Sequence, residues 1–306
     1  MEIRKVGNSG LAVSVLGLGC NNFGMRIGPE ETADVVNAAI EAGITLFDTA
    51  EMYGGGKSEE FLGAALSKSG KRDDVIIASK FGRAGQGGSR SEIIRSCERS
   101  LQRLGTDYID LYYQHYVDRT TPIDETLAAL TQLVEQGKVR YLGSSNVDAW
   151  HVAEADHTAR EQHLERFVAC QMEWSVLNRA IETEIVPVCR RYGLGVISYF
   201  PLASGLLSGK YRKGEPPPEG TRFAAMPFFA GVATEENWEK VGKLTDFAES
   251  KGKQILDLAI GWVASQPETA SVLVGATRPE QVASNAAAIE WQLSPEELAK
   301  VAELLG

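Results

Sequence analysis

The chain has 306 residues, of which 43% are hydrophobic, and a formal net charge of -10 at pH 7. A chain of this length and composition can bury a large core, as one barrel domain or as two smaller domains. The acidic charge, which no basic run reverses, argues against a nucleic-acid partner or any other polyanion.

Short β-branched or aromatic runs alternate along the chain with helical patterns of about 10 to 15 residues, which is typical of repeated βα units around a parallel sheet. After a β-hairpin predicted in residues 2–17, eight runs have the composition of buried strands. They are VLGLG (15–19), TLFDT (45–49), VIIASK (75–80), YIDLYYQ (108–114), VRYLGSS (139–145), FVACQME (167–173), GVISYF (195–200) and SVLVGA (271–276). Eight parallel strands in a chain somewhat longer than the usual ~250 residues favour a (β/α)8 TIM barrel over a doubly wound sheet. Because no linker divides the chain, we expect an α/β fold in which residues 1–306 form a single barrel domain with an N-terminal β-hairpin.

Two helical patterns carry clear end signals. Pro29 stands near the start of one, and Gly43 lies just past its end, which is the usual asymmetry of helix termini. In the other, Thr121 is a candidate N-cap ahead of Pro122, and Gly137 is the expected stop.

Residues 213–231, KGEPPPEGTRFAAMPFFAG, interrupt the alternation after the seventh strand. Three consecutive prolines and several glycines predict an irregular segment. Its place after the seventh strand puts it at the barrel rim, where enzymes with this fold have their active sites. Its apolar side chains form either a substrate lid or a surface loop whose aromatic residues pack among themselves. These side chains are Phe223, Met226, Phe228 and Phe229.

Four residues that suit carbonyl reduction follow predicted strand ends: Asp48 and Tyr53 in TLFDTAEMYG, Lys80 in VIIASKFG, and His115 in YIDLYYQHYVD. A tyrosine is a poor acid near neutral pH, because its ordinary pKa is about 10, but a neighbouring ammonium lowers that value. Lys80 is placed to supply this charge, and Asp48 would keep a buried lysine protonated. His115 would orient the substrate oxygen or share its proton. Each residue alone has a structural explanation, but together at the C-terminal strand ends they indicate a proton-transfer site.

The cysteines, Cys20, Cys97, Cys170 and Cys189, are widely spaced and form no CxxC pair. This spacing predicts free thiols in a reducing compartment rather than a disulfide framework or a zinc site. The opening MEIRKVGNSG does not read as a signal peptide, and no apolar run approaches the roughly 18 residues that span a bilayer. We therefore expect a cytoplasmic protein with no membrane partner.

The remaining histidines, His151, His157 and His163, recur every six residues along one helical stretch. This spacing does not align ligands on one face of a helix, so we expect a solvated surface there and no metal site.

Seven sequence blocks resemble, in the same order, blocks of the aldo-keto reductases: FDTAEMYG, SKFG, LYYQH, GSSN, QMEWS, SYFPLASGLLSGKY and VLVGATRPEQVASN. The resemblance covers essentially the whole chain and is closer to the bacterial and potassium-channel-β-like branches than to the mammalian aldose-reductase branch. It implies an NADPH-dependent barrel with the cofactor extended across its C-terminal face. It assigns the general acid to Tyr53 and the positioning of the carbonyl to His115. Lys80 and Asp48 would be the pair that tunes the tyrosine.

The same resemblance implies where the nicotinamide end of the cofactor binds. Ser145, Asn146 and Gln171 would hydrogen-bond the carboxamide. The Tyr199 ring would stack on the nicotinamide and leave one face open to substrate. The segment PLASGLLSGK would offer backbone N–H groups to the pyrophosphate, with Lys210 as a point charge.

The last strand and its helix would hold the adenosine end. Gly275 and Thr277 lie at a strand-to-helix turn, where helix N-terminal N–H groups attract phosphate. Arg278 is placed for a 2′-phosphate, which favours NADPH over NADH, while Gln281 and Asn285 share one helix face. The complete predicted cofactor set is Cys20, Asn21, Ser145, Asn146, Gln171, Tyr199, Phe200, Pro201, Leu202, Ser204, Gly205, Leu206, Lys210, Gly275, Thr277, Arg278, Gln281 and Asn285.

The block CNNF departs from the family, because Cys20 and Asn21 stand where many relatives have Thr and an aromatic residue or methionine. The rim loops hold Asn22, Phe23 and Tyr116, which predicts a partly aromatic substrate pocket. Aryl aldehydes, dicarbonyls, sugars and keto-steroids all suit such a pocket, and neither the reaction direction nor the oligomeric state follows from the sequence. The predicted function is reduction of aldehydes or ketones to alcohols. The alternatives are a non-catalytic NADP(H)-sensing subunit on the same fold and a barrel hydrolase or lyase, which would need metal ligands or paired acids that the strand ends lack.

Overall fold

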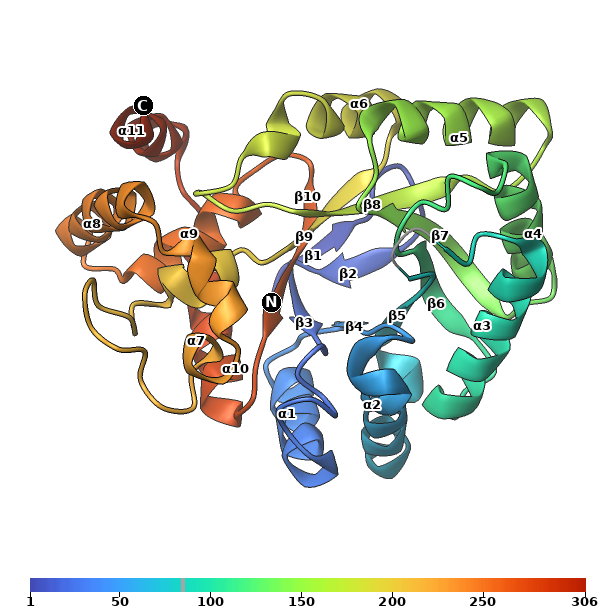
Figure 1. Ribbon diagram of the computed structural model, residues 1–306, viewed down its shortest axis with the longest axis horizontal. Coiled ribbons are helices and arrows are strands. Elements are labelled where there is room, and N and C mark those ends of the chain that lie inside the picture. The colour runs from blue at the N-terminus through green and yellow to red at the C-terminus, as the bar shows by residue number, and fades with distance from the viewer. Residues whose placement is uncertain (84–85) are drawn as a thin grey trace.

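The computed structural model describes residues 1–83 and 86–306 and confirms the predicted (β/α)8 barrel with an N-terminal hairpin (Figure 1). Eight parallel strands close into a barrel in chain order, because the last strand pairs with both its predecessor and the first. Each strand overlaps one of the eight predicted runs. The strands are β3 (Leu16–Gly19), β4 (Leu46–Asp48), β5 (Ile76–Phe81), β6 (Ile109–Gln114), β7 (Val139–Ser145), β8 (Phe167–Glu173), β9 (Gly195–Tyr199) and β10 (Thr269–Gly275).

Helices connect the strands and form the outer ring visible in Figure 1. The first of these helices turns an apolar stripe towards the barrel, with Val35, Val36 and Ala39 buried. None of the helices in the described part of the chain combines the length and the apolar character that a bilayer crossing requires. The helices are α1 (Pro29–Glu41), α2 (Lys57–Ser69), α3 (Arg90–Leu104), α4 (Ile123–Glu135), α5 (Ala149–Glu161), α6 (Ile185–Tyr192), α7 (Arg222–Ala225), α8 (Glu235–Ser250), α9 (Ile255–Ala264), α10 (Pro279–Ala288) and α11 (Pro295–Leu305).

The hairpin of β1 (Ile3–Lys5) and β2 (Ala12–Ser14) closes the N-terminal end of the barrel. Val6, Leu11 and Val13 from the hairpin share an apolar cluster with side chains that point into the barrel from the strands. Burying a side chain of this size contributes roughly 1.5 to 3 kcal/mol. The hairpin therefore leaves the opposite, C-terminal end of the barrel as the open one.

Strand alternation decides which side chains reach that open end. Successive residues of a strand point to opposite faces, so Asp48 in β4, Lys80 in β5 and Gln171 in β8 point inward. Gly143 in β7 provides room inside the barrel, since a Cβ there would come within 2.4 Å of the Tyr113 ring. The pleat of the barrel thus gathers polar side chains from several strands into one layer.

Two local predictions need correction. The N-cap of α4 is Pro122 rather than Thr121, because the Thr121 hydroxyl instead donates to the Asp118 carboxylate at 3.0 Å. Residues 213–231 are not irregular throughout, since α7 and a short 3₁₀ segment, Pro227–Val232, follow the prolines. The predicted ends at Pro29 and Gly43 are confirmed: Pro29 is the first residue of α1, and Gly43 follows it with a φ of +79°.

The histidines of α5 do not share one environment. His157 is exposed, and a ring nitrogen lies 3.1 Å from the Tyr192 hydroxyl. His151, which was expected on the surface, is buried beside Val152 and Ala155 on the inner face of α5. Burial lowers its pKa. The four cysteines are buried and free, in agreement with the prediction from their spacing.

Candidate active site

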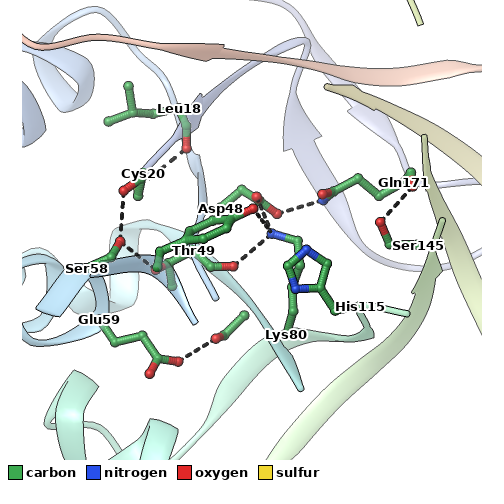
Figure 2. A network of polar contacts seen from close by, with 12 residues as sticks. Leu18, Cys20, Asp48, Thr49, Ser58, Glu59, Lys80, His115, Ser145 and Gln171 are labelled. Carbon is green, nitrogen blue, oxygen red and sulfur yellow. Dashed lines mark hydrogen bonds and ion pairs between the residues drawn. The ribbon is translucent and has the colours of Figure 1, made fainter. Parts of the chain in front are cut away.

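A charged network occupies the C-terminal end of the barrel (Figure 2). The Lys80 Nζ donates to Asp48 Oδ1 at 2.5 Å, to the Thr49 carbonyl oxygen at 2.8 Å and, at a longer 3.5 Å, to the Tyr53 hydroxyl. The Gln171 Nε2 donates to the second carboxylate oxygen of Asp48 at 2.7 Å. Lys80 is fully buried and Asp48 is 3% exposed. The ion pair is therefore fixed on both sides and shielded from water.

The charge state of Lys80 follows from this environment. Burial acts to lower its pKa, but the Asp48 carboxylate and Tyr53 together outweigh burial, so the pKa of Lys80 is raised. The lysine therefore stays protonated near neutral pH. The Lys80 charge acts to lower the pKa of Tyr53, as the sequence predicts, but the net shift of that pKa is upward. Burial raises the pKa of Tyr53, and the Lys80 charge opposes this effect without overcoming it, so the tyrosine is a neutral phenol.

His115 follows β6 and faces Tyr53, with the two ring centroids 5.9 Å apart and the rings nearly perpendicular. Its other face stacks on Tyr116 at 4.7 Å. Burial, assisted by the Lys80 charge, lowers the pKa of His115 to about 3. The imidazole is therefore neutral, with one N–H to donate, and its Nδ1 is buried without a partner among the described residues.

A cavity of about 320 Å³ opens above this network and is lined by Asp48, Tyr53 and His115. The structure brings most of the predicted cofactor residues into its wall. These are Asn21, Ser145, Asn146, Gln171, Tyr199, Phe200, Pro201, Leu202, Ser204, Gly205, Lys210, Gly275, Thr277 and Gln281.

Four predicted cofactor residues do not line the cavity. Cys20 is buried with its thiol directed at the Leu18 carbonyl oxygen (Figure 2). Leu206 is packed in the core, and Asn285 is buried on α10. Arg278 is exposed at the N-cap of α10. Lys80 also lies behind the wall and reaches the cavity only through Asp48 and Tyr53.

Three polar side chains at the barrel mouth hold one another in place. The Tyr199 hydroxyl donates to Asn146 Oδ1 at 2.7 Å, and the Asn146 amide donates to the His115 carbonyl oxygen at 3.0 Å and to the Ser145 hydroxyl at 3.1 Å. Asn146 has a φ of +54°, a left-handed conformation that asparagine tolerates better than most residues. The Gln171 amide, in contrast, is already engaged with Asp48.

The loop after β9 is strained where it borders the cavity. Phe200, Ala203 and Ser204 have φ values of +53°, +45° and +57°. Such conformations cost about 1 to 3 kcal/mol each in non-glycine residues and are concentrated at ligand clamps and active sites. The strain is therefore consistent with a backbone shaped to meet a ligand.

A group of cations surrounds the other end of the cavity. Arg26, Lys210 and Arg222 line the cavity together, and Arg278 stands at the nearby N-cap of α10. Burial lowers the pKa of Lys210, and the charges of the three arginines lower it further. None of them forms an ion pair with an acid in the described ranges, although the chain has 41 acidic residues. We call Arg26, Lys210, Arg222 and Arg278 the cationic cluster; its composition suits a ligand with several phosphate charges.

Two members of this cluster are not predicted from the sequence. Arg222 lies in the segment 213–231, which drew attention for its aromatic residues, and Arg26 follows β3. The Arg26 guanidinium donates to the Gly220 carbonyl oxygen at 2.7 Å and so ties the two loops together. No short motif marks either arginine, because only the fold brings them beside Lys210.

Phe223 has different surroundings from the other two aromatic residues of 213–231. Phe223 is buried and stacks on Tyr211 at 4.1 Å, and Phe229 meets Phe200 edge to face at 5.9 Å. Phe228 is 89% exposed. Phe223 is thus a core side chain, whereas Phe228 and Phe229 meet each other edge to face at 5.6 Å, as the surface-loop alternative predicts. Phe229 packs on the cavity wall through Phe200.

A parallel eight-stranded barrel with ionisable side chains gathered at its C-terminal end is the architecture of many barrel enzymes. The sequence model of the "Aldo/keto reductase family" matches residues 15–305. The chain belongs to the aldo/keto reductase family, a family of oxidoreductases, as its sequence blocks predict.

Several relatives align over nearly the full chain. A "Probable voltage-gated potassium channel subunit beta" of Oryza sativa subsp. japonica is 35% identical, with 98% of this chain and 95% of the relative aligned. A "Probable aldo-keto reductase 1" of Glycine max is 36% identical over 98% of this chain and 87% of the relative. A "Probable voltage-gated potassium channel subunit beta" of Arabidopsis thaliana is 34% identical over 95% and 92%.

Proposed function

We propose that this protein is an NADPH-dependent oxidoreductase that reduces an aldehyde or ketone to an alcohol, with Tyr53 as the general acid. The observation that carries the proposal is the Tyr53 hydroxyl in the cavity wall, 3.5 Å from the Nζ of the buried Lys80. As negative charge develops on the substrate oxygen, the Tyr53 O–H gives its proton to that oxygen. The phenolate that remains is stabilised by the adjacent ammonium.

His115 and Asp48 support this transfer in different ways. A neutral imidazole can donate one N–H to the substrate oxygen and hold it within reach of Tyr53. Asp48, held by Lys80 and Gln171, keeps the lysine charged and in place. NADPH, when bound, would supply the hydride that the carbonyl carbon accepts.

The choice of NADPH rests on the cationic cluster. A dinucleotide phosphate carries charge on its pyrophosphate and on its 2′-phosphate, and four cations that have no acidic partner among the described residues suit this distribution. Arg278, at the N-cap of α10, would bind the 2′-phosphate. Ser145 and Asn146 would bind the carboxamide, and the Tyr199 ring would pack against the nicotinamide.

A second candidate is a nucleotide-sensing subunit that binds the cofactor without turnover. The similarity to proteins named as potassium channel β subunits favours it. The proton-transfer group of Asp48, Tyr53, Lys80 and His115 is complete, however, which a purely sensing subunit would not need.

NADPH consumption against a panel of carbonyl compounds separates the two candidates. The panel should contain aryl aldehydes, α-dicarbonyls, sugars and keto-steroids, because the aromatic wall around Tyr116 and Phe200 suits all four. A reductase oxidises NADPH only when a carbonyl is present and yields the alcohol in equal amount. Tight NADPH binding with no turnover on any compound would favour the sensing subunit.

A further inference from the structure

Glu173, the last residue of β8, brings a carboxylate to the cavity wall. Because strand side chains alternate, Glu173 points to the same side as Gln171, which reaches Asp48 inside the barrel. Glu173 stands opposite Tyr199 on the neighbouring strand. Its carboxylate therefore lies at the barrel mouth, one layer above the Asp48 and Lys80 pair.

The Glu173 carboxylate stands without a partner in the part of the chain that the structure describes. Within residues 1–83 and 86–306, no side-chain hydrogen bond or ion pair reaches it. Other shielded acids of the chain are paired, as Glu59 is with Arg103 and Asp156 is with Arg160. A partly buried charge without a partner is unfavourable, so a carboxylate at this place suits a positive group that arrives with a ligand.

The charges of the cavity are divided between its two ends. The cationic cluster forms one end. Glu173 lies in the part of the cavity wall that holds Tyr53 and Tyr199, opposite Tyr199 on the neighbouring strand. A ligand with phosphates at one end and a positive charge at the other matches this division. The oxidised nicotinamide dinucleotide has this distribution, since its ring is positive, whereas the reduced ring is neutral.

We propose that Glu173 stabilises the positive ring of the oxidised cofactor, lowers the potential of the bound cofactor and so makes bound NADPH a stronger reductant. This inference rests on the function proposed above. The Glu173 charge does reach the site: burial, together with that charge, raises the pKa of the neighbouring Tyr199. Glu173 acts by its charge on the bound cofactor and takes no part in proton transfer.

Dissociation constants for NADP⁺ and NADPH, measured by calorimetry on the full chain, test this proposal. In Glu173→Gln the constant for NADP⁺ should rise about fivefold, which is the upper value for a partly exposed charge pair, while that for NADPH should stay unchanged. A fivefold rise in the ratio of the NADP⁺ dissociation constant to the NADPH dissociation constant raises the potential of the bound cofactor by about 20 mV. Glu173→Asp keeps the charge and should keep the ratio close to that of the wild type.

The control is Glu161→Gln, which removes the same charge from an exposed position at the end of α5 and should change neither constant. Equal changes for both cofactors in Glu173→Gln, or an unchanged ratio, overturn the proposal but leave the reductase function standing. An unchanged ratio with a raised KM for amino aldehydes would assign the carboxylate to the substrate instead. Wild-type protein that binds neither cofactor overturns both proposals.

Discussion

Replacing Lys80 by Met should destabilise the fold as well as abolish reduction. Lys80 is fully buried, and its Nζ lies 2.5 Å from the 3% exposed Asp48 carboxylate. Removing one member of such a pair leaves a buried charge without a counter-ion, which costs about 3 to 5 kcal/mol. The Gln171 amide, which is neutral, would remain as the side-chain donor to Asp48. Equilibrium urea unfolding at pH 7.5 should therefore show a loss of about 3 to 5 kcal/mol relative to the wild type.

The pH dependence of this loss identifies its cause. Burial acts to raise the pKa of Asp48, and without Lys80 the opposing charge is absent. A folded-state carboxyl pKa above the unfolded value of about 3.9 means that the folded state binds the proton more tightly. The loss of unfolding free energy in Lys80→Met should thus be smallest below about pH 3.9. It should grow as the pH rises through the raised folded-state pKa of Asp48 and be complete above that pKa.

A double-mutant cycle completes this test. Asp48→Asn combined with Lys80→Met removes both charges, so it should be more stable at pH 7.5 than Lys80→Met alone. All of these variants should lack activity. A Lys80→Met protein that loses less than about 1 kcal/mol, or whose loss is the same at acid and neutral pH, would refute the argument that the pair is a buried and mutually dependent unit.

Three further predictions concern the cofactor and the histidine. Arg222→Ala should weaken NADPH binding by about 1.5 to 3 kcal/mol, the range of a charge-assisted hydrogen bond. The control Arg191→Ala, on the exposed side of α6, should leave NADPH binding unchanged. Equal effects of the two substitutions would place Arg222 outside the site. Arg278→Ala should weaken NADPH binding by a similar amount and barely affect NADH binding, as titrations with both cofactors can show. Because the pKa of His115 is lowered to about 3, its stabilising contribution is complete above about pH 6.5 and is lost as the pH falls towards 3. The pH profile of kcat/KM should accordingly show no acid limb near 6.5, and such a limb that disappears in His115→Gln would contradict the neutral imidazole.

The sequence contains enough information to predict the barrel and the layer of residues at its open end. Buried parallel strands read as short apolar runs, and each of the eight runs is a strand of the barrel. Residues at or just past a strand end all face the same rim in this architecture. The positions of Asp48, Lys80 and His115 at the ends of three successive strands therefore predict one site, and in the structure Lys80 pairs with Asp48 while Asp48 and His115 line the same cavity.

The parts that could not be predicted depend on distances through space. Arg26 lies far from Lys210 and Arg222 in the sequence, and the closed barrel brings it into the same cavity wall. The direction in which the pKa of Tyr53 shifts depends on a balance between burial and the Lys80 charge. The depth of burial is set by the tertiary structure. The helical phase that buries His151 depends on how α5 packs, which the six-residue spacing of the histidines does not reveal.

The substitution Tyr53→Phe tests the central claim most directly, because it removes one hydroxyl and leaves the rest of the cavity in place. Turnover with the best carbonyl substrate and the dissociation constant for NADPH should be measured on the same preparation. Loss of a positioned general acid should reduce kcat by about 10²- to 10⁴-fold, while NADPH binding changes by less than about twofold. Turnover close to that of the wild type would contradict the account, since another group would then supply the proton.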